Sequence, residues 1–510
     1  MFEACKATSE AKFDFQNRPY NTANSNGLRY KSLTVDKIDV DATIKKVQQL
    51  LAEEAHLSSA LRAALEVLMV LVQLLANRLS LTSRHSSKPP STDRFNKDDK
   101  ANNDDNNQKQ GKKNKPGGQP GRIGTTLQKV DDPDEIEILE LDRTTLPPGK
   151  YQAIGFEVRQ VFDIDIRRLV TEYQAEILED QSGKRFTASF PEAVTKAVQY
   201  GNGVKAQAVY LSQYQLIPYQ RVQEQFQDQF QLPISAGSIF AFNQQAYALL
   251  EQFELKLIAK MLLSSVLHAD ETGINIGGKN HWLHCISNPQ WTLYYAHAKR
   301  GSEAMTANNV LPRFTGILCH DHWKPYFQLS CLHALCNAHH LRELTYAEEQ
   351  DHQVWAKQMR ELLLDIEQAV KAQGGALPEL QAISYSEHYR ALLKQAELEC
   401  PPPDPQRKPG QRGRIKRSKA RNLLERLLNY EQETLRFMID ARVPFTNNQG
   451  ENDIRMTKVH QKISGCFRSQ EGADIFCRVR SYLSTCRKNN VSASEALTLL
   501  FDGTLPEFIL

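Results

Sequence analysis

The spacing of apolar residues changes several times along the chain, and each change marks a different kind of element. Between residues 41 and 80, apolar side chains recur at alternating steps of three and four, interrupted only at Glu54, which is the a/d seam of a coiled coil. The seam consists of Val47, Leu50, Leu57, Leu61, Ala64, Leu68, Leu71 and Leu75. We expect a helix here that dimerises the protein; the alternative is a helix that packs on its own domain. Residues 1–40 are polar and irregular.

Two segments without helical periodicity follow. Residues 82–122 contain no Val, Ile, Leu or Met, so they bury too little apolar surface to offset the entropy of ordering. We expect a disordered polar linker. Within residues 123–185, the runs IEILEL, FEVRQVFDI and LVTEYQAEIL alternate between apolar and polar positions, as strands do. This segment therefore predicts a small β-rich domain.

Residues 186–262 return to a helical pattern. PYQRVQEQF and ISAGSIFAFNQQAYALL lie on either side of QFQLP, and Ser235 is placed to cap the second helix. The arrangement predicts a helix-turn-helix DNA reader or an ordinary helical hairpin. The second helix carries few basic residues, which weighs against DNA reading.

Two short apolar runs each end in an aspartate. SVLHAD ends at Asp270 and GILCHD ends at Asp321. Between them HWLHCIS and WTLYYAHA alternate like antiparallel strands, and a helix is expected near 302–310. This order, three strands, a helix and a strand, is that of a ribonuclease-H-like α/β core. An aspartate at the carboxyl end of a strand projects to the sheet edge where ligands of open α/β sheets bind.

Carboxylates on two neighbouring strands suit Mg²⁺, which prefers oxygen ligands and keeps several waters. A third carboxylate is available at Glu451, where VPFTNNQGENDIRMTK starts a helix. Arg455 and Lys458 would share a helix face with it. Two such ions would support phosphoryl transfer. Glu271 ranks second to Asp270, because alternation along a strand points it to the other side.

The longer motifs resemble those of a known family. HADETG, GILCHDHWKPY, HALCNAHHLREL, TNNQGENDIRMTKVHQKISGCFRS and the N-terminal SSKPPSTD and GGQPGR are similar to motifs of DDE-type transposases of the insertion-sequence 66 family. The resemblance runs from about residue 50 to the end of the chain. It implies that Asp270, Asp321 and Glu451 form a catalytic triad that binds Mg²⁺ or Mn²⁺. The triad would cut DNA at the transposon ends and join the freed 3′-hydroxyl to target DNA.

The resemblance also implies partners: transposon-end and target DNA, a second copy of the chain or a larger assembly, and accessory proteins of the same element. Two other functions stay open. One is an inactive DNA-binding regulatory relative, and the other is a metal-dependent nuclease that cuts without joining.

Asp321 and Glu451 are 130 residues apart, which is more than a minimal core needs. We therefore expect the core to be split into 263–350 and 443–510 by a helical insertion over 351–442. Its helices are expected in HQVWAKQMRELLLDIEQAVKA and ARNLLERLLNYEQETLRFMID, separated in part by a basic loop at 406–421.

The basic loop has eight Lys or Arg in 16 residues and no acid, a density that neutralises several phosphates. We expect DNA contacts in this loop and around the Glu451 helix. The residues are Arg407, Lys408, Arg412, Arg414, Lys416, Arg417, Arg455, Lys458, Lys462 and Arg468.

The whole-chain charge is only +3, from 63 basic and 60 acidic residues, so DNA binding would depend on local clusters of charge. The N-terminus lacks the apolar core of a signal peptide. The most apolar run, 67–76, is about half of a membrane span. We expect a soluble cytoplasmic protein, associated with the nucleoid and not with a membrane.

Cysteine spacing argues against structural zinc. The segment CLHALCNAHH contains Cys331, His333, Cys336, His339 and His340. Zinc fingers usually pair two ligand clusters about a dozen or more residues apart, so we interpret this segment as core bracing and expect no zinc. Many family members carry a Cys-rich element in the region of 135–170, whereas this chain has no Cys between 5 and 285. Zinc-assisted recognition of DNA ends is therefore not expected here.

Overall fold

The computed structural model describes residues 34–35, 38–53, 58–79, 126–164, 166–403 and 417–509. The chain divides into two compact units. The first comprises Met1–Lys100, Asn202–Ile217 and Ala241–Leu510, and the second comprises Ala101–Gly201 and Pro218–Phe240. The linker expected at 82–122 and most of the basic loop lie outside the described residues.

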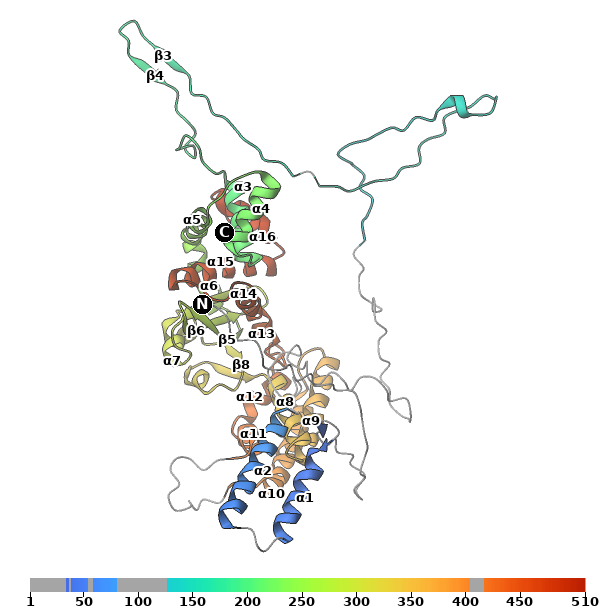
Figure 1. Cartoon of the computed structure of the whole chain (residues 1–510), viewed down its shortest axis with the longest axis vertical. Helices are drawn as coiled ribbons and strands as arrows, with labels where there is room; N and C mark the ends of the chain where they lie inside the picture. The colour runs from blue at the N-terminus through green and yellow to red at the C-terminus, as the bar shows by residue number, and fades with distance from the viewer. Residues whose placement is uncertain are drawn as a thin grey trace, which may run out of the picture. The chain divides into compact units, whose positions relative to one another are not determined.

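The segment expected as one coiled-coil helix contains two helices. After the short antiparallel strands β1 (Thr34–Val35) and β2 (Ile38–Asp39), α1 spans Val40–Glu53 and α2 spans Ser59–Leu79. The two helices contact each other side by side, as Figure 1 shows. Pairing within the chain covers part of the apolar surface, whereas Leu68 and Leu71 on α2 stay more than half exposed.

The β-rich domain expected over 123–185 is not formed by the described residues. Besides a single 3₁₀ turn, η4 (Arg143–Thr145), regular structure here consists of β3 (Ile177–Glu179) paired antiparallel with β4 (Arg185–Thr187). Leu139 and Val161 in the alternating runs are 83% and 92% exposed. The alternation failed as a predictor because a two-stranded hairpin buries little apolar area without a further layer to pack on.

Helices begin at Asn202, later than the expected residue 186. They are α3 (Asn202–Val209), the π-helical turn η5 (Tyr210–Tyr214), α4 (Tyr219–Phe230), α5 (Ala236–Leu249) and α6 (Glu251–Leu262). Gln231 ends α4 in the left-handed conformation, with φ of 51°. Ser235 Oγ accepts the Ser238 N–H at 3.0 Å, which confirms the predicted cap of α5.

A five-stranded mixed sheet forms the centre of the first unit, in the order β7-β6-β5-β8-β9. The strands are β5 (Val266–Ile276), β6 (Lys279–Ser287), β7 (Thr292–His297), β8 (Ile317–His320) and β9 (Leu332–Leu335). β5, β6 and β7 are antiparallel, and β8 and β9 run parallel to β5. With α7 (Ser302–Ala307) before β8, the expected strand and helix order is confirmed. The mixed sheet is consistent with a ribonuclease-H-like core.

The turn between β5 and β6 makes β5 longer than expected, so the position of Asp270 in the strand differs from the predicted one. Gly277 and Gly278 form a two-residue loop with φ of 56° and 81°, a conformation that favours glycine and tight hairpins. The hairpin extends β5 to Ile276. Asp270 therefore lies inside its strand and not at its carboxyl end, whereas Asp321 does follow the end of β8.

The insertion is helical, as expected, but it shares its core with the sheet. The elements just before it are η6 (Leu311–Arg313), η7 (Lys324–Gln328) and α8 (Asn337–Glu349). The helices within it are α9 (Val354–Ala372), α10 (Glu379–Glu399), α11 (Lys419–Asn429) and α12 (Glu431–Ile439). Ile317 and Cys319 of β8 join Trp355 and Leu424 in one apolar cluster. The second expected helix is divided at Tyr430.

The C-terminal part consists of α13 (Asn448–Ile454), α14 (Met456–Ser464), α15 (Gln470–Lys488), α16 (Ala493–Phe501) and the turn η8 (Glu507–Ile509). Helix α15 covers the edge strand β7. Ser481 Oγ and Thr485 Oγ1 accept the N–H groups of Tyr294 and Thr292. These bonds satisfy strand donors that an open sheet edge would leave unpaired. No helix in the described ranges is long and apolar enough to cross a membrane.

Candidate active site

Asp270 and Asp321 lie side by side because two parallel strands bring them together. Val266 on β5 is opposite Ile317 on β8, and His268 is opposite Cys319. The same register, continued two residues further, would set Asp270 opposite Asp321, and the Asp321 carboxylate contributes to the raised pKa of Asp270. Asp270 Oδ1 accepts the N–H of Glu271, and Asp321 Oδ1 accepts the N–H of Trp323, each at 2.9 Å. The expected convergence of the two aspartates is therefore present, although one of them is in mid-strand.

The pair is a site of poorly compensated negative charge. Burial, together with the nearby carboxylates of Glu271, Asp321 and Glu451, raises the pKa of Asp270 to about 8. Burial also raises the pKa of Asp321, against the opposing effects of the Trp323 N–H and nearby guanidinium groups. Carboxylates crowded in this way repel one another, and a bound cation would relieve the repulsion.

Glu451 enters the site from α13. Its Oε1 lies 3.6 Å from Nδ1 of His339 and 3.8 Å from Nη2 of Arg342. The thiol of Cys336 donates to the same oxygen at 3.8 Å. The Glu451 charge reaches Asp270, whose pKa it raises. Glu451 thus lies close enough to influence Asp270, and its role as a third metal ligand stays a prediction.

Sequence reasoning did not foresee that Cys336 and His339 meet Glu451. Their ligand atoms all lie within 4.8 Å of one another; among the described residues, the three acidic residues of the expected triad do not form such a group. Burial raises the pKa of the Cys336 thiol to about 11 and lowers that of His339 to about 4. The CxxH spacing at the start of α8 was the available signal, since residues three apart share a helix face. The expectation of no structural zinc stays a prediction.

Glu271 is engaged elsewhere. Its Oε1 accepts two bonds from Arg300, at 2.8 and 2.9 Å, and its Oε2 accepts the Tyr326 hydroxyl at 2.5 Å. The Arg300 guanidinium also lies over the rings of Trp282 and Trp323. This fully paired carboxylate is a weaker candidate for metal binding than Asp270, in keeping with its second rank.

The basic residues after Glu451 do not share its helix. Lys458 and Lys462 lie on α14, Arg455 lies between α13 and α14, and Arg468 lies in the loop before α15. The chain changes direction at Arg455, whose N–H bonds to the Asn452 carbonyl three residues back. Lys458 Nζ donates to the Gly273 carbonyl of β5 at 3.3 Å, and partial burial lowers its pKa. Arg455, Lys462 and Arg468 are exposed. These last three form no ion pair with the described part of the chain.

The remaining basic residues have different surroundings. Arg407, Lys408, Arg412, Arg414 and Lys416 lie outside the described residues. Arg417 pairs with Glu425.

Cations on α15 hold the fold together. Arg478 bonds to Glu254 at 2.5 and 2.9 Å, and Lys488 Nζ lies 2.7 Å from Asp453 Oδ2. These two side chains are therefore committed to internal ion pairs and are poor candidates for DNA contact.

The donor set at the strand junction fits Mg²⁺ or Mn²⁺. Asp270, Asp321 and Glu451 supply oxygen ligands of the kind that these hard cations prefer. Burial and the neighbouring carboxylates both raise the pKa of Asp270, so a cation bound there would stabilise its charged form.

A comparison with protein families identifies the family of the chain. A family model described as "Transposase IS66 family" matches residues 197–475, more than half of the chain. That range includes Asp270, Asp321 and Glu451. A second model, "Family of unknown function (DUF6444)", matches residues 38–128. A comparison with curated proteins found no match. Because the match covers more than half of the chain, the chain belongs to the IS66 family of transposases.

Proposed function

We propose that this transposase binds the terminal inverted repeats of its element, cleaves at their ends and joins the 3′-hydroxyl to target DNA. Asp270, Asp321 and Glu451 are the catalytic, metal-binding carboxylates in this proposal. The observation that carries it is the parallel register of β5 and β8, which sets Asp270 beside Asp321.

Two Mg²⁺ or Mn²⁺ ions, when bound, would activate the attacking oxygen and stabilise the leaving oxygen of each phosphoryl transfer. The chain supplies the ligands and holds them in a buried position. Asp270 would give up a proton on becoming a ligand, because its pKa of about 8 favours the protonated carboxyl at neutral pH in the metal-free protein. Exclusion of water around the carboxylates strengthens every electrostatic interaction there.

The DNA partner is expected along α14 and the basic loop. Lys458 contacts β5 at Gly273, three residues after Asp270, so a cation is available close to the catalytic strand. Arg455, Lys462 and Arg468 are exposed and free of acidic partners in the described chain. Loop residues 407–417 add further cations. Neutralising several phosphates in this way makes DNA affinity fall steeply with salt.

A homodimer or larger assembly is part of the proposal, since two transposon ends must be held together. The exposed apolar residues of α2 are its proposed contact surface. Accessory proteins of the same element are a further proposed class of partner.

The test uses purified full-length protein, duplexes that carry the inverted repeats of its own element, and Mg²⁺. We expect nicks at the repeat ends and a strand-transfer product with a target plasmid. Asp270→Asn should abolish both products and leave DNA binding intact. Asp365→Asn, an equal change of charge at an exposed position of α9, is the matched control and should cleave normally.

Each other outcome has a definite meaning. Binding without cleavage or joining favours the regulatory relative, and cleavage without joining favours the nuclease. Cleavage by the Asp270→Asn variant at the wild-type rate would overturn the assignment of the triad.

A further inference from the structure

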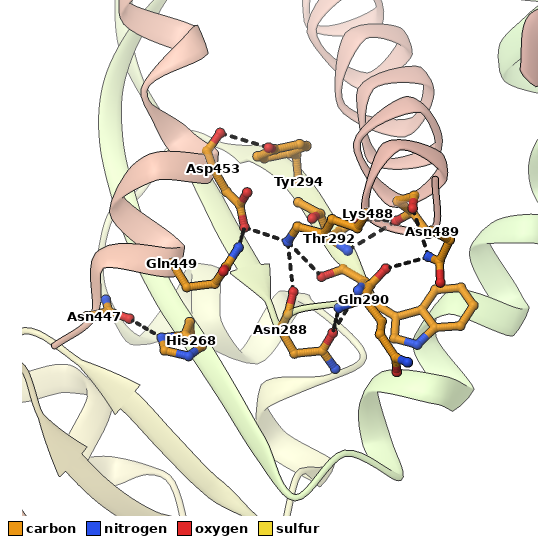
Figure 2. Close-up of polar contacts among 12 residues, drawn as sticks. His268, Asn288, Gln290, Thr292, Tyr294, Asn447, Gln449, Asp453, Lys488 and Asn489 are labelled. Carbon is orange, nitrogen blue, oxygen red and sulfur yellow. Dashed lines mark hydrogen bonds and ion pairs between the residues drawn. The ribbon is translucent and has the colours of Figure 1, made fainter. Parts of the chain in front are cut away.

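Asn447 occupies the junction between the strand of Asp270 and the helix of Glu451. It lies just before α13 and is 2% exposed. Its side-chain Oδ1 accepts Nδ1–H of His268 at 2.7 Å, and its Nδ2 donates to the Ala269 carbonyl at 2.8 Å. Figure 2 shows Asn447 reaching from the helix toward His268 on the sheet. One amide group thus binds the two residues that precede Asp270.

The backbone of Asn447 bonds to the residues on the Glu451 side of the site. Its carbonyl accepts the N–H of Glu451 at 3.2 Å, and its N–H donates to Cys336 Sγ at 3.1 Å. Cys336 in turn donates to the Glu451 carboxylate. Asn447 therefore links β5, the start of α8 and the first turn of α13.

The site needs an amide because it needs one acceptor and one donor at fixed positions. An alanine lacks both groups, and a serine hydroxyl is too short to reach both partners. Space is also tight: a Cβ on Gly450 would lie 3.3 Å from Asn447 Oδ1 and 3.5 Å from the Cβ of His268. The glycine thus lets α13 approach β5 closely.

The other end of α13 is held by a separate network. Asp453 Oδ2 lies 2.7 Å from Lys488 Nζ and accepts Gln449 Nε2 at 2.9 Å. Tyr294 of β7 donates to the Asp453 carbonyl at 2.8 Å. Figure 2 shows this network some distance along the helix from Asn447. With that end fixed, Asn447 is the link that sets the first turn of α13, and hence Glu451, against the Asp270 strand.

We propose that Asn447 is a positioning residue that sets Glu451 relative to Asp270 and thereby the affinity of the triad for divalent metal. The proposal rests on the proposed function of the same site. Its expected effect is large, because catalytic groups misplaced by about 1 Å lose of the order of 100-fold in rate.

The test compares Asn447→Ala and the milder Asn447→Ser with wild type. Mn²⁺ binding to the full-length protein is measured by electron paramagnetic resonance of the free ion, and end cleavage is measured at saturating DNA over a range of Mn²⁺ concentrations. We expect Asn447→Ala to bind Mn²⁺ at least about 10-fold more weakly and to cleave at least about 10-fold more slowly. Asn447→Ser should fall between it and wild type. DNA affinity without metal should be unchanged.

Asn308→Ala is the matched control. Asn308 is also a buried asparagine, and its side chain bonds to Tyr295, Met305, Val310 and Leu311, none of them on α13. It should lose thermal stability much as Asn447→Ala does, yet keep wild-type metal affinity. Equal losses of metal affinity in both variants would show a general effect of destabilisation and would overturn the proposal.

Wild-type Mn²⁺ affinity in Asn447→Ala would also overturn it. A wild-type protein that binds Mn²⁺ but does not cut DNA would refute the proposed function instead, while the comparison of metal affinities would still decide the role of Asn447. A folded Asn447→Ser variant keeps the test decisive if the alanine variant does not fold.

Discussion

Asp270 has a protonation equilibrium that depends on the folded structure. Its pKa is 3.8 in the absence of structural effects and about 8 in the folded chain, chiefly because burial disfavours the charged form. The folded state therefore binds this proton more tightly than the unfolded state does. Between these two pKa values, the contribution of Asp270 to stability falls as pH rises, and it levels off above about pH 8.

Replacing Asp270 by a residue that does not titrate should stabilise the metal-free protein. We predict that Asp270→Asn in EDTA raises the melting temperature at pH 8 and has much less effect near pH 4.5. Each kcal/mol corresponds to roughly 2–4 °C in a domain of 150–250 residues, so a rise of several °C is expected. Calorimetry at the two pH values checks this, with Asp365→Asn as the control. A pH-independent difference would contradict the assigned pKa.

The sequence identified some residues of the candidate site and did not identify others. Asp270, Asp321 and Glu451 were predicted because each lies in a recognisable motif. The partners of the third carboxylate, Cys336 and His339, were seen as a motif but not as neighbours of Glu451. Nothing in the sequence distinguished Asn447 from Asn448, because their difference lies in what each side chain meets in the fold.

At the level of elements, α13 depends on contacts with parts of the chain distant in sequence. Lys488 on α15 pairs with Asp453 on α13, and both side chains are largely buried, at 13% and 14% exposure. Lys488 also donates to the carbonyls of Asn288 and Trp291, as Figure 2 shows in part. One ammonium group therefore joins the helix of Glu451 to α15 and to the loop before β7.

Truncating this lysine should be costly. We predict that Lys488→Ala lowers the free energy of unfolding by about 3–5 kcal/mol, because it leaves the Asp453 carboxylate buried and unpaired. Urea unfolding measures the loss. The control is Arg442→Ala, which breaks the more exposed pair with Asp440 and should cost about 1 kcal/mol or less. Equal losses in the two variants would contradict the buried pair's role.

The β5–β6 turn provides a prediction of backbone strain. Gly278→Ala should destabilise the fold by about 1–2 kcal/mol, because φ is 81° there although the space around it is open. Gly203→Ala, within α3 and also in open space, should instead stabilise by roughly 0.5–1 kcal/mol. Chemical denaturation of both variants tests the pair. A stabilised Gly278→Ala would show that the turn relaxes.

On the scale of the whole molecule, the exposed apolar face of α2 is the surface proposed for assembly. Leu61, Leu68 and Leu71 are each at least half exposed on a helix. Single exposed apolar residues are ordinary, but several at coiled-coil spacing indicate a partner surface.

Charge on this face should disrupt the assembly. We predict that wild type is a dimer or larger in light scattering and that Leu68→Glu with Leu71→Glu is a monomer. Circular dichroism should show unchanged helix content. Leu398→Glu, at an 86% exposed position of α10, is the control and should leave the assembly intact. A wild-type monomer would refute the proposed contact surface.

The arrangement of the catalytic core was predictable in outline, and its surroundings were not. The order of strands and helices from 265 to 320 follows from local alternation, and the insertion follows from the distance between Asp321 and Glu451. Within the described part of 123–185 only the β3–β4 hairpin is sheet, because alternation indicates that a strand is possible, not that a layer exists to cover it. Likewise α1 and α2 continue one heptad pattern, yet they are separate helices that pack together.

The amino-acid sequence by itself determined the family, the three acidic candidates, the strand order of the core and the helical nature of the insertion. These properties depend on local periodicity and on motifs that lie within short segments. Only the tertiary structure decided that Asp270 is in mid-strand beside Asp321, and that Glu451 meets Cys336 and His339. It also decided that Asn447 and Asp453 hold α13 in place. The physical reason is that these contacts join residues more than 30 positions apart, and their geometry is set by strand register and packing, which no local pattern specifies.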